Sequence, residues 1–145
     1  MEMNKKRKLL CSGGFGTMGY SIPAAIGASF GDKKSKIIST CGDGSFQMSL
    51  FELATIKQEG LSPLIILFNN NGLGMVKEIQ KIKNKNKYGV DMNCNPDFTV
   101  IAQAYGLKSK TIKDKNNINE SLKEAIESNE PYLLEFIVDD NESTL

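Results

Sequence analysis

Residues 37–45 read Ile-Ile-Ser-Thr-Cys-Gly-Asp-Gly-Ser, and residues 64–72 read Leu-Ile-Ile-Leu-Phe-Asn-Asn-Asn-Gly. Each stretch opens with a short, mainly apolar run, which is typical of a strand buried in a parallel sheet. Polar residues and glycines follow each run directly, so we expect them at the carboxyl ends of the two strands. Open α/β sheets bind their ligands at that edge. The two stretches therefore predict one binding site built from both polar clusters.

These clusters supply oxygen ligands. Asp43 is a single carboxylate between Gly42 and Gly44, and the asparagine cluster 69–71 offers an amide oxygen beside free backbone carbonyls. Such a set suits Mg²⁺ or Ca²⁺ and does not suit zinc, and a metal with so few protein charges takes phosphate oxygens as further ligands. The glycines allow a tight turn around an ion, and a helix expected just after Ser45 adds its positive end. The pattern predicts a metal–diphosphate site.

A second glycine-rich segment, Gly14 to Gly19, matches the pattern GxGxxG and imitates a dinucleotide-binding fingerprint. Two observations oppose that interpretation. The apolar run before the segment, Leu9 to Cys11, is very short for a strand, and a ribose-binding acid does not need the glycines that flank Asp43. A non-catalytic nucleotide-binding module nevertheless stays open as an alternative.

Composition excludes several classes of function. The chain has 145 residues, 40% of them hydrophobic and 24% charged, with a net charge of +1, which argues against a nucleic-acid or membrane partner. It has no histidine, so it lacks the commonest general base. Its three cysteines are widely spaced and indicate reduced thiols. With neither a signal peptide nor a membrane span visible, we expect a single cytoplasmic domain.

Strands and helices are expected to alternate along the chain, which predicts an α/β fold: a three-layer sandwich with a mostly parallel sheet. The expected strands are 9–11, 36–41, 64–68, 107–112 and 132–138. The expected helices are 21–31, 49–60, 75–82, 97–105 and 119–128, the last with Leu122, Ala125 and Ile126 facing inward. Ser21, Ser49 and Asn95 are the expected helix caps. We divide the chain into an arm with the first short strand (1–11), the binding domain (12–138) and a tail (139–145), and expect residues 81–93 and 71–76 to be mobile.

Several of these motifs also form a family pattern. Gly42-Asp43-Gly44, then 24 residues, then Asn69-Asn70 resembles the cofactor-binding signature of thiamine diphosphate enzymes. The wider similarity is to the large catalytic subunit of acetolactate (acetohydroxyacid) synthase, and specifically to its C-terminal cofactor-binding domain. It runs from about Ser12 to Val138, and its most specific segments are 12–28, 42–48, 52–55, 73–76 and 95–98.

The resemblance implies a role for each matching position. Mg²⁺ would be held by Asp43, by the side chain of Asn70 and by the main-chain oxygen of Gly72. The aminopyrimidine would meet the backbone of Gly16, and Met18 would support the bent cofactor from beneath. The thiamine diphosphate-binding residues that it implies are Gly16, Thr17, Met18, Gly42, Gly44, Ser45, Asn70, Gly72, Leu73, Gly74, Met75 and Val76.

The resemblance also implies a reaction, the decarboxylative condensation of pyruvate with a second 2-keto acid in branched-chain amino acid biosynthesis. The glutamate that activates the cofactor lies in the family's pyrimidine-binding domain, and neither Glu52 nor Glu78 stands in that motif. We therefore expect no catalytic residue in this chain, no activity from it alone, and that domain as its partner in a homo-oligomeric enzyme. Ile79 replaces a tryptophan that lines the family's substrate channel, which leaves open another thiamine diphosphate-dependent decarboxylase, oxidase or carboligase.

Overall fold

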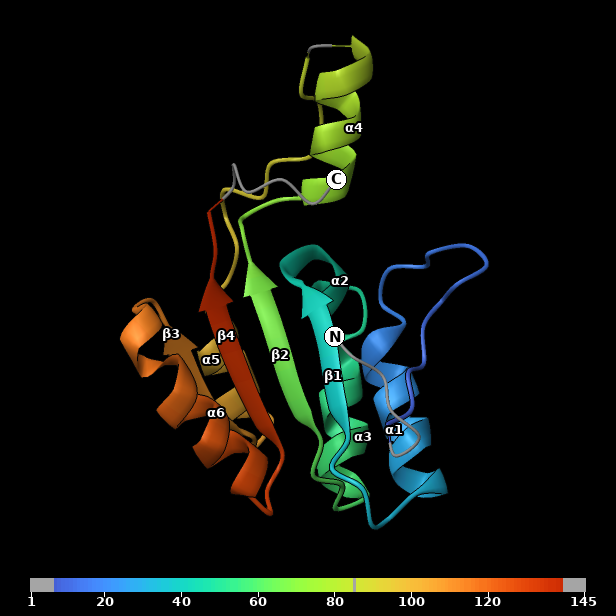
Figure 1. The fold of residues 1–145 in the computed structure, drawn as a ribbon, viewed down its shortest axis with the longest axis vertical. Coiled ribbons are helices and arrows are strands. Elements are labelled where there is room, and N and C mark those ends of the chain that lie inside the picture. Colours follow the sequence, from blue (N-terminus) through green and yellow to red (C-terminus); the bar gives the residue numbers. More distant parts are fainter. Residues whose placement is uncertain (1–6, 85, 140–145) are drawn as a thin grey trace.

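The computed structural model of the protein describes residues 7–84 and 86–139, and its centre is a four-stranded sheet. All three strand pairings are parallel and the order is β1-β2-β4-β3, so every carboxyl end lies at the same edge (Figure 1). The α/β fold with a parallel sheet is confirmed. The strands are β1 (Ile38–Gly42), β2 (Leu64–Asn69), β3 (Lys108–Ile112) and β4 (Tyr132–Ile137).

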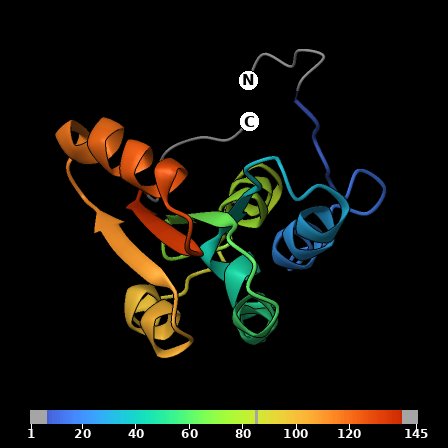
Figure 2. The same ribbon diagram turned by 90° about the horizontal axis from the view of Figure 1, so that it is seen from below.

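Alternate residues of the central strands point into two separate apolar cores. Ile65 and Leu67 of β2 contribute to the larger core on one face, whereas Leu64 contributes to the smaller core on the other. Figure 2 shows the helices in two layers, with α6 over one face and α3 and α5 over the other. This arrangement is the predicted three-layer sandwich. The helical segments are α1 (Ser21–Gly31), α2 (Asp43–Gln47), η1 (Leu50–Glu52), α3 (Leu53–Gln58), α4 (Gly74–Asn84), α5 (Phe98–Ala104), η2 (Lys115–Asn117) and α6 (Ile118–Glu127).

The strand expected at residues 9–11 is wrong. Residues 7–12 form no regular element, and Leu9 and Leu10 are exposed. Two exposed leucines bury too little apolar surface to offset the entropy of ordering a strand. The glycine segment after them therefore follows no strand, which removes the structural context that a dinucleotide fingerprint requires. Residues 1–6 of the expected arm and 140–145 of the expected tail lie outside the described residues.

Two of the three predicted helix caps, Ser21 and Asn95, are wrong, whereas Ser49 is the N-cap residue of η1 but makes no side-chain capping bond. Ser21 lies inside α1, whose N-cap is Tyr20. The segment after Ser49 begins as the 3₁₀ turn η1, and the hydroxyl of Ser49 is buried without a hydrogen-bond partner among the described residues. The cap of α5 is Asp97, because its carboxylate accepts the N–H groups of Thr99 and Val100. Asn95 is thereby free for the role described below.

One inward position of α6 differs from the prediction. Ala125 is fully buried and Leu122 packs on the smaller core, as expected, but Ile126 is 46% exposed. The inward stripe is instead Ile118, Ser121, Leu122 and Ala125, which is the regular spacing of one helix face. The hydroxyl of Ser121 made that stripe hard to recognise in the sequence.

Within the described ranges, no helix is both long and apolar enough to cross a membrane. Helix α4 is the most separate element, because it projects beyond the carboxyl ends of the strands (Figure 1). Its outward surface includes Ile82, which is 69% exposed.

We expect amide hydrogens in the outer half of α4 and in residues 86–89 to exchange much faster than those of β4 in the cofactor-free chain. Segments with few buried apolar contacts open locally at low free energy, whereas β4 lies in the centre of the sheet. Hydrogen exchange with mass spectrometry measures the difference. Equal protection of the two segments would contradict the expectation.

Candidate metal and diphosphate site

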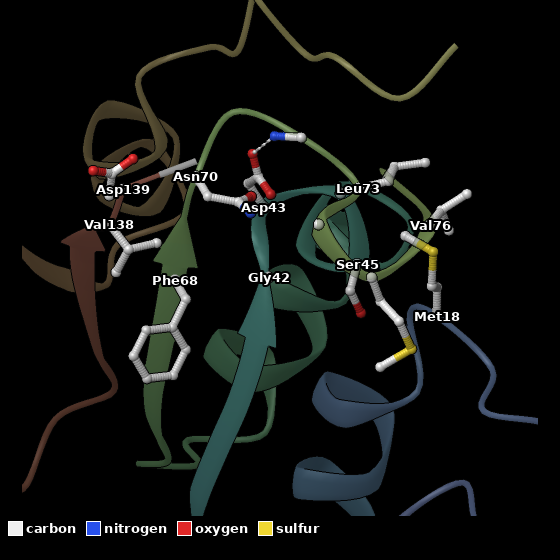
Figure 3. Close-up of a pocket in the computed structure, with 14 residues that line it drawn as sticks. Met18, Gly42, Asp43, Ser45, Phe68, Asn70, Leu73, Val76, Val138 and Asp139 are labelled. Atoms are coloured by element: carbon white, nitrogen blue, oxygen red, sulfur yellow. Dashed lines mark hydrogen bonds between the residues drawn. The ribbon is translucent and has the colours of Figure 1, made fainter. Parts of the chain in front are cut away.

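An open pocket of about 460 Å³ lies at the carboxyl ends of β1 and β2, where the sequence places its polar clusters (Figure 3). Asp43 and Asn70 point toward one another across the gap between the two strand ends, and Met18 and Val76 lie on the side away from Val138. The pocket is lined by Met18, Gly42, Asp43, Gly44, Ser45, Phe68, Asn70, Gly72, Leu73, Gly74, Met75, Val76, Val138 and Asp139.

Asp43 is the first residue of α2 and is 1% exposed. The helix therefore begins at the acid itself, and the prediction that it begins after Ser45 is wrong. The Oδ2 atom of Asp43 accepts the N–H of Gly72 at 3.1 Å and the Nδ2 of Asn95 at 2.7 Å. Its Oδ1 atom is buried and has no hydrogen-bond partner within the part of the chain that the structure describes. A buried carboxylate oxygen left unsatisfied is costly, which makes Oδ1 a natural ligand for a cation.

The loop after β2 brings the other predicted ligands beside Asp43. Asn71 adopts a left-handed backbone (φ 53°), which reverses the chain just after Asn70. A Cβ atom on Gly74 would lie 2.8 Å from Nδ2 of Asn70, so the glycine makes room for that side chain. The structure thus brings the three predicted metal ligands, Asp43, Asn70 and Gly72, into the lining of one pocket.

Gly44 forms the floor of the part predicted to hold a diphosphate. A Cβ atom there would lie 2.5 Å from Leu73, 3.2 Å from the sulfur of Met92 and 3.3 Å from Met18. The absence of a side chain keeps this cradle open and exposes backbone to a ligand. Ser45 was predicted to help hold the diphosphate. Its hydroxyl oxygen already accepts the N–H of Gly19 at 2.9 Å.

The segment 90–92 fastens the loop of the metal ligands from outside. Backbone bonds join Leu73 N to Val90 O and Met92 N to Asn71 O. The ammonium of Lys77 lies 2.7 Å from Asp91 in an ion pair in which only the lysine is buried. The hydrogen bond from this ammonium holds the pKa of the Asp91 carboxyl below its ordinary value, which favours the charged form of Asp91 in the ion pair.

Two predicted cofactor residues are not brought to the pocket. Gly16 and Thr17 lie in an exposed loop whose N–H groups bond the carbonyl and hydroxyl of Ser12. Their role stays a prediction. All the other predicted cofactor and metal residues line the pocket.

Sequence reasoning missed three lining residues, Phe68, Val138 and Asp139. Each lies at or just beyond the carboxyl end of β2 or β4, so strand-end position was the signal that could have identified them. It also missed the polar contacts behind Asp43. There, Asn69 donates to Glu135 at 2.8 Å, and Glu135 also accepts from Thr111 at 2.7 Å.

The remaining chemistry of the site is limited. Burial raises the pKa of the Cys41 thiol to about 12, so this cysteine beside the pocket is no thiolate nucleophile. Across residues 7–84 and 86–139, no three His, Cys, Asp or Glu side chains gather as a metal cluster. The lining of the pocket includes the carboxylate of Asp43, the amide of Asn70 and the backbone of Gly72. A carboxylate, an amide oxygen and a backbone oxygen are the kinds of ligand that suit a hard cation.

Comparison with known proteins agrees with this geometry. Residues 1–136 match the family described as thiamine pyrophosphate enzyme, C-terminal TPP binding domain. The chain is 45% identical over 134 residues to a probable acetolactate synthase large subunit of Methanococcus aeolicus, and 41% identical over 130 residues to the mitochondrial acetolactate synthase catalytic subunit of Saccharomyces cerevisiae. These alignments cover 92% and 90% of this chain but 22% and 19% of the relatives, so the chain spans about a fifth of their length.

A solved structure gives the same answer. The thiamine diphosphate-dependent 4-hydroxybenzoylformate decarboxylase of Rhodococcus jostii RHA1 superposes with a TM-score of 0.80 at 28% identity, over 87% of this chain and 24% of that one. The family match, the acetolactate synthase relatives and the shared fold agree with the resemblance read from the motifs. This chain belongs to the C-terminal thiamine pyrophosphate-binding domain family of the thiamine pyrophosphate enzymes.

Proposed function

We propose that this domain binds thiamine diphosphate through Mg²⁺ and serves an acetolactate synthase-type enzyme. The observation that supports Mg²⁺ binding is the buried Oδ1 atom of Asp43. It lacks a hydrogen-bond partner among the described residues, and Asp43 lines the pocket. The acetolactate synthase relatives support the type of enzyme.

In this proposal, residues of this chain bind the metal and the cofactor and orient the cofactor. Asp43, Asn70 and the main-chain oxygen of Gly72 hold the metal, while the backbone at Gly44 and Ser45 and the turn 73–76 hold the diphosphate. Met18 supports the rings from beneath, as a long unbranched side chain can. Bound thiamine diphosphate supplies the electron sink for decarboxylation.

The proposed reaction is the decarboxylative condensation of pyruvate with a second 2-keto acid in branched-chain amino acid biosynthesis, as the resemblance to acetolactate synthase implies; the relatives' names support the acetolactate synthase part. The proposed partners are a pyrimidine-binding domain and a further copy of the enzyme. A related decarboxylase is the second candidate, because the similar solved structure is a decarboxylase and Ile79 stands where the resembled family has a tryptophan. Product analysis with the complete enzyme separates acetolactate from simple aldehyde release.

Calorimetry tests the cofactor directly. We expect the chain to bind thiamine diphosphate in a Mg²⁺-dependent manner, and to bind NAD and ATP much more weakly or not at all. Each ligand is titrated with Mg²⁺ and with a chelator. A preference for ATP or NAD, or binding of thiamine diphosphate that ignores the metal, would contradict the proposal.

We expect Asn70→Ala to weaken Mg²⁺-dependent cofactor binding about 10-fold or more, because the substitution removes a proposed oxygen ligand. Even the loss of a residue that only contacts a metal ligand weakens metal binding about 10–100-fold. The comparison variant is Asn71→Gly, which should weaken binding less, because Asn71 is no proposed metal ligand and loses only the contact of its Oδ1 with Asn95 Nδ2 at 3.3 Å. Its left-handed backbone makes glycine the substitution that adds no strain, whereas alanine would add some. Equal losses in both variants would show that the metal ligand is assigned to the wrong asparagine.

A further inference from the structure

The Asp43 carboxylate is held by an asparagine from a distant part of the chain. Nδ2 of Asn95 donates to Asp43 Oδ2 at 2.7 Å, and this is the shorter of the two hydrogen bonds that this oxygen accepts. Hydrogen bonds to an ionised acceptor are short and strong. Because Oδ2 is occupied by two donors, the carboxylate is oriented with Oδ1 as its available oxygen.

The orientation of Asn95 is itself determined by a second contact. Its Oδ1 accepts the Nε2 of Gln47 at 3.0 Å, so its Nδ2 is the atom that faces Asp43. Gln47 ends α2, the helix that Asp43 begins. The amide of Asn95 therefore bridges both ends of that short helix.

Asn95 also contacts the second loop of the site. Its Nδ2 lies 3.3 Å from Oδ1 of Asn69 and 3.3 Å from Oδ1 of Asn71. These residues flank Asn70, the other side chain proposed to bind the metal. Asn95 thus connects Asp43, which follows β1, to Asn69 and Asn71 at the end of β2, and it does not itself line the pocket.

We propose that Asn95 is the positioning residue of the metal site. It directs Oδ1 of Asp43 toward the cation and fixes the distance between the two loops that supply ligands. This role rests on the proposed Mg²⁺–thiamine diphosphate function and adds to it a residue that would not touch metal or cofactor.

Metal selectivity distinguishes positioning from a general contribution to stability. Mg²⁺ requires near-ideal octahedral geometry at short distances, whereas Ca²⁺ accepts longer and more variable coordination. A carboxylate that is free to rotate therefore costs Mg²⁺ more than Ca²⁺. A loosened fold would weaken both metals alike.

The test measures Mg²⁺ and Ca²⁺ affinities of the full chain at saturating thiamine diphosphate by calorimetry, with thermal melts to monitor folding. We expect Asn95→Ala to weaken Mg²⁺ about 10–100-fold, as outer partners of metal ligands do, and Ca²⁺ clearly less. Gln47→Ala keeps Asn95 but removes the hydrogen bond that fixes the orientation of its amide. This variant should lower the ratio of Mg²⁺ to Ca²⁺ affinity as well, but by less. Asn93→Ala is the matched control, since Asn93 is an exposed asparagine two residues away.

Wild-type protein and Asp43→Ala are measured alongside. Wild-type protein that shows no Mg²⁺-dependent binding would overturn the proposed function and this role together. Binding that Asp43→Ala abolishes while Asn95→Ala keeps the wild-type Mg²⁺/Ca²⁺ ratio would overturn only the role of Asn95. If Asn95→Ala does not fold, Gln47→Ala decides, and an unchanged ratio there overturns the role.

Discussion

Replacing Asp43 with alanine should abolish Mg²⁺-dependent binding of thiamine diphosphate while the domain remains folded. Asp43 is the one charged side chain among the three proposed metal ligands. It contributes the buried oxygen that lacks a hydrogen bond among the described residues. Losing a direct ligand should exceed the about 10–100-fold loss that outer partners cause. Titration of the cofactor with and without Mg²⁺ measures the effect.

Two further variants make the Asp43 experiment specific. Asp43→Asn keeps the size of the side chain and removes its charge, so it should fold and still lose most of the metal affinity. Asp32→Ala removes a partly exposed acid that follows α1, at the opposite end of the sheet from the pocket, and should bind like the wild type. Unchanged cofactor affinity in Asp43→Ala would refute the metal assignment.

The second large effect is the absence of turnover. We expect this chain alone to form no acetolactate from pyruvate, and a pyrimidine-binding domain added in cis or in trans to restore the reaction. In the family that it resembles, an activating glutamate comes from that other domain. Neither Glu52 nor Glu78 lines the pocket, and Glu135 is engaged with Asn69 and Thr111 behind it.

Acetolactate assays with saturating thiamine diphosphate and Mg²⁺ test this expectation. Robust product from the chain alone would contradict it. The next variant would then be Asp139→Asn, because Asp139 is the only other acid among the lining residues besides Asp43. Restoration by the added domain, and its loss when Asp43 is replaced, would connect turnover to this pocket.

The strands that carry the site could be predicted because buried parallel strands are continuous apolar runs in the sequence. The runs 64–68 and 132–138 correspond to β2 and β4 almost residue for residue. The strand-end polar residues indicated a metal–diphosphate site, and the family resemblance then selected Asp43, Asn70 and Gly72 as its proposed ligands. These are local signals, each contained within about ten residues.

What could not be predicted depends on contacts between distant segments. The hydrogen bond from Asn95 joins residues 52 positions apart, and Asn95 with Pro96 after it is also a plausible helix start. Likewise, Leu9 and Leu10 have the composition of a strand, but no neighbouring strand buries them. Sequence spacing identifies which residues reach the edge of the sheet, but not which of them orient one another there.

Hydrogen bonds join residues 71–73 to residues 90–92, so the chain between these two segments is held together at its base. Gly72 pairs with Asp91 in an isolated antiparallel bridge just where α4 leaves the domain and the chain returns. Residues 78–84 of α4 lie beyond this bridge, and none of them lines the pocket. Substitutions among them are therefore expected to leave the pocket lining unchanged. The bridge thus holds the pocket-lining turn 72–76 separately from the outer turns of α4, and that part of the helix can vary in sequence without disturbing the pocket.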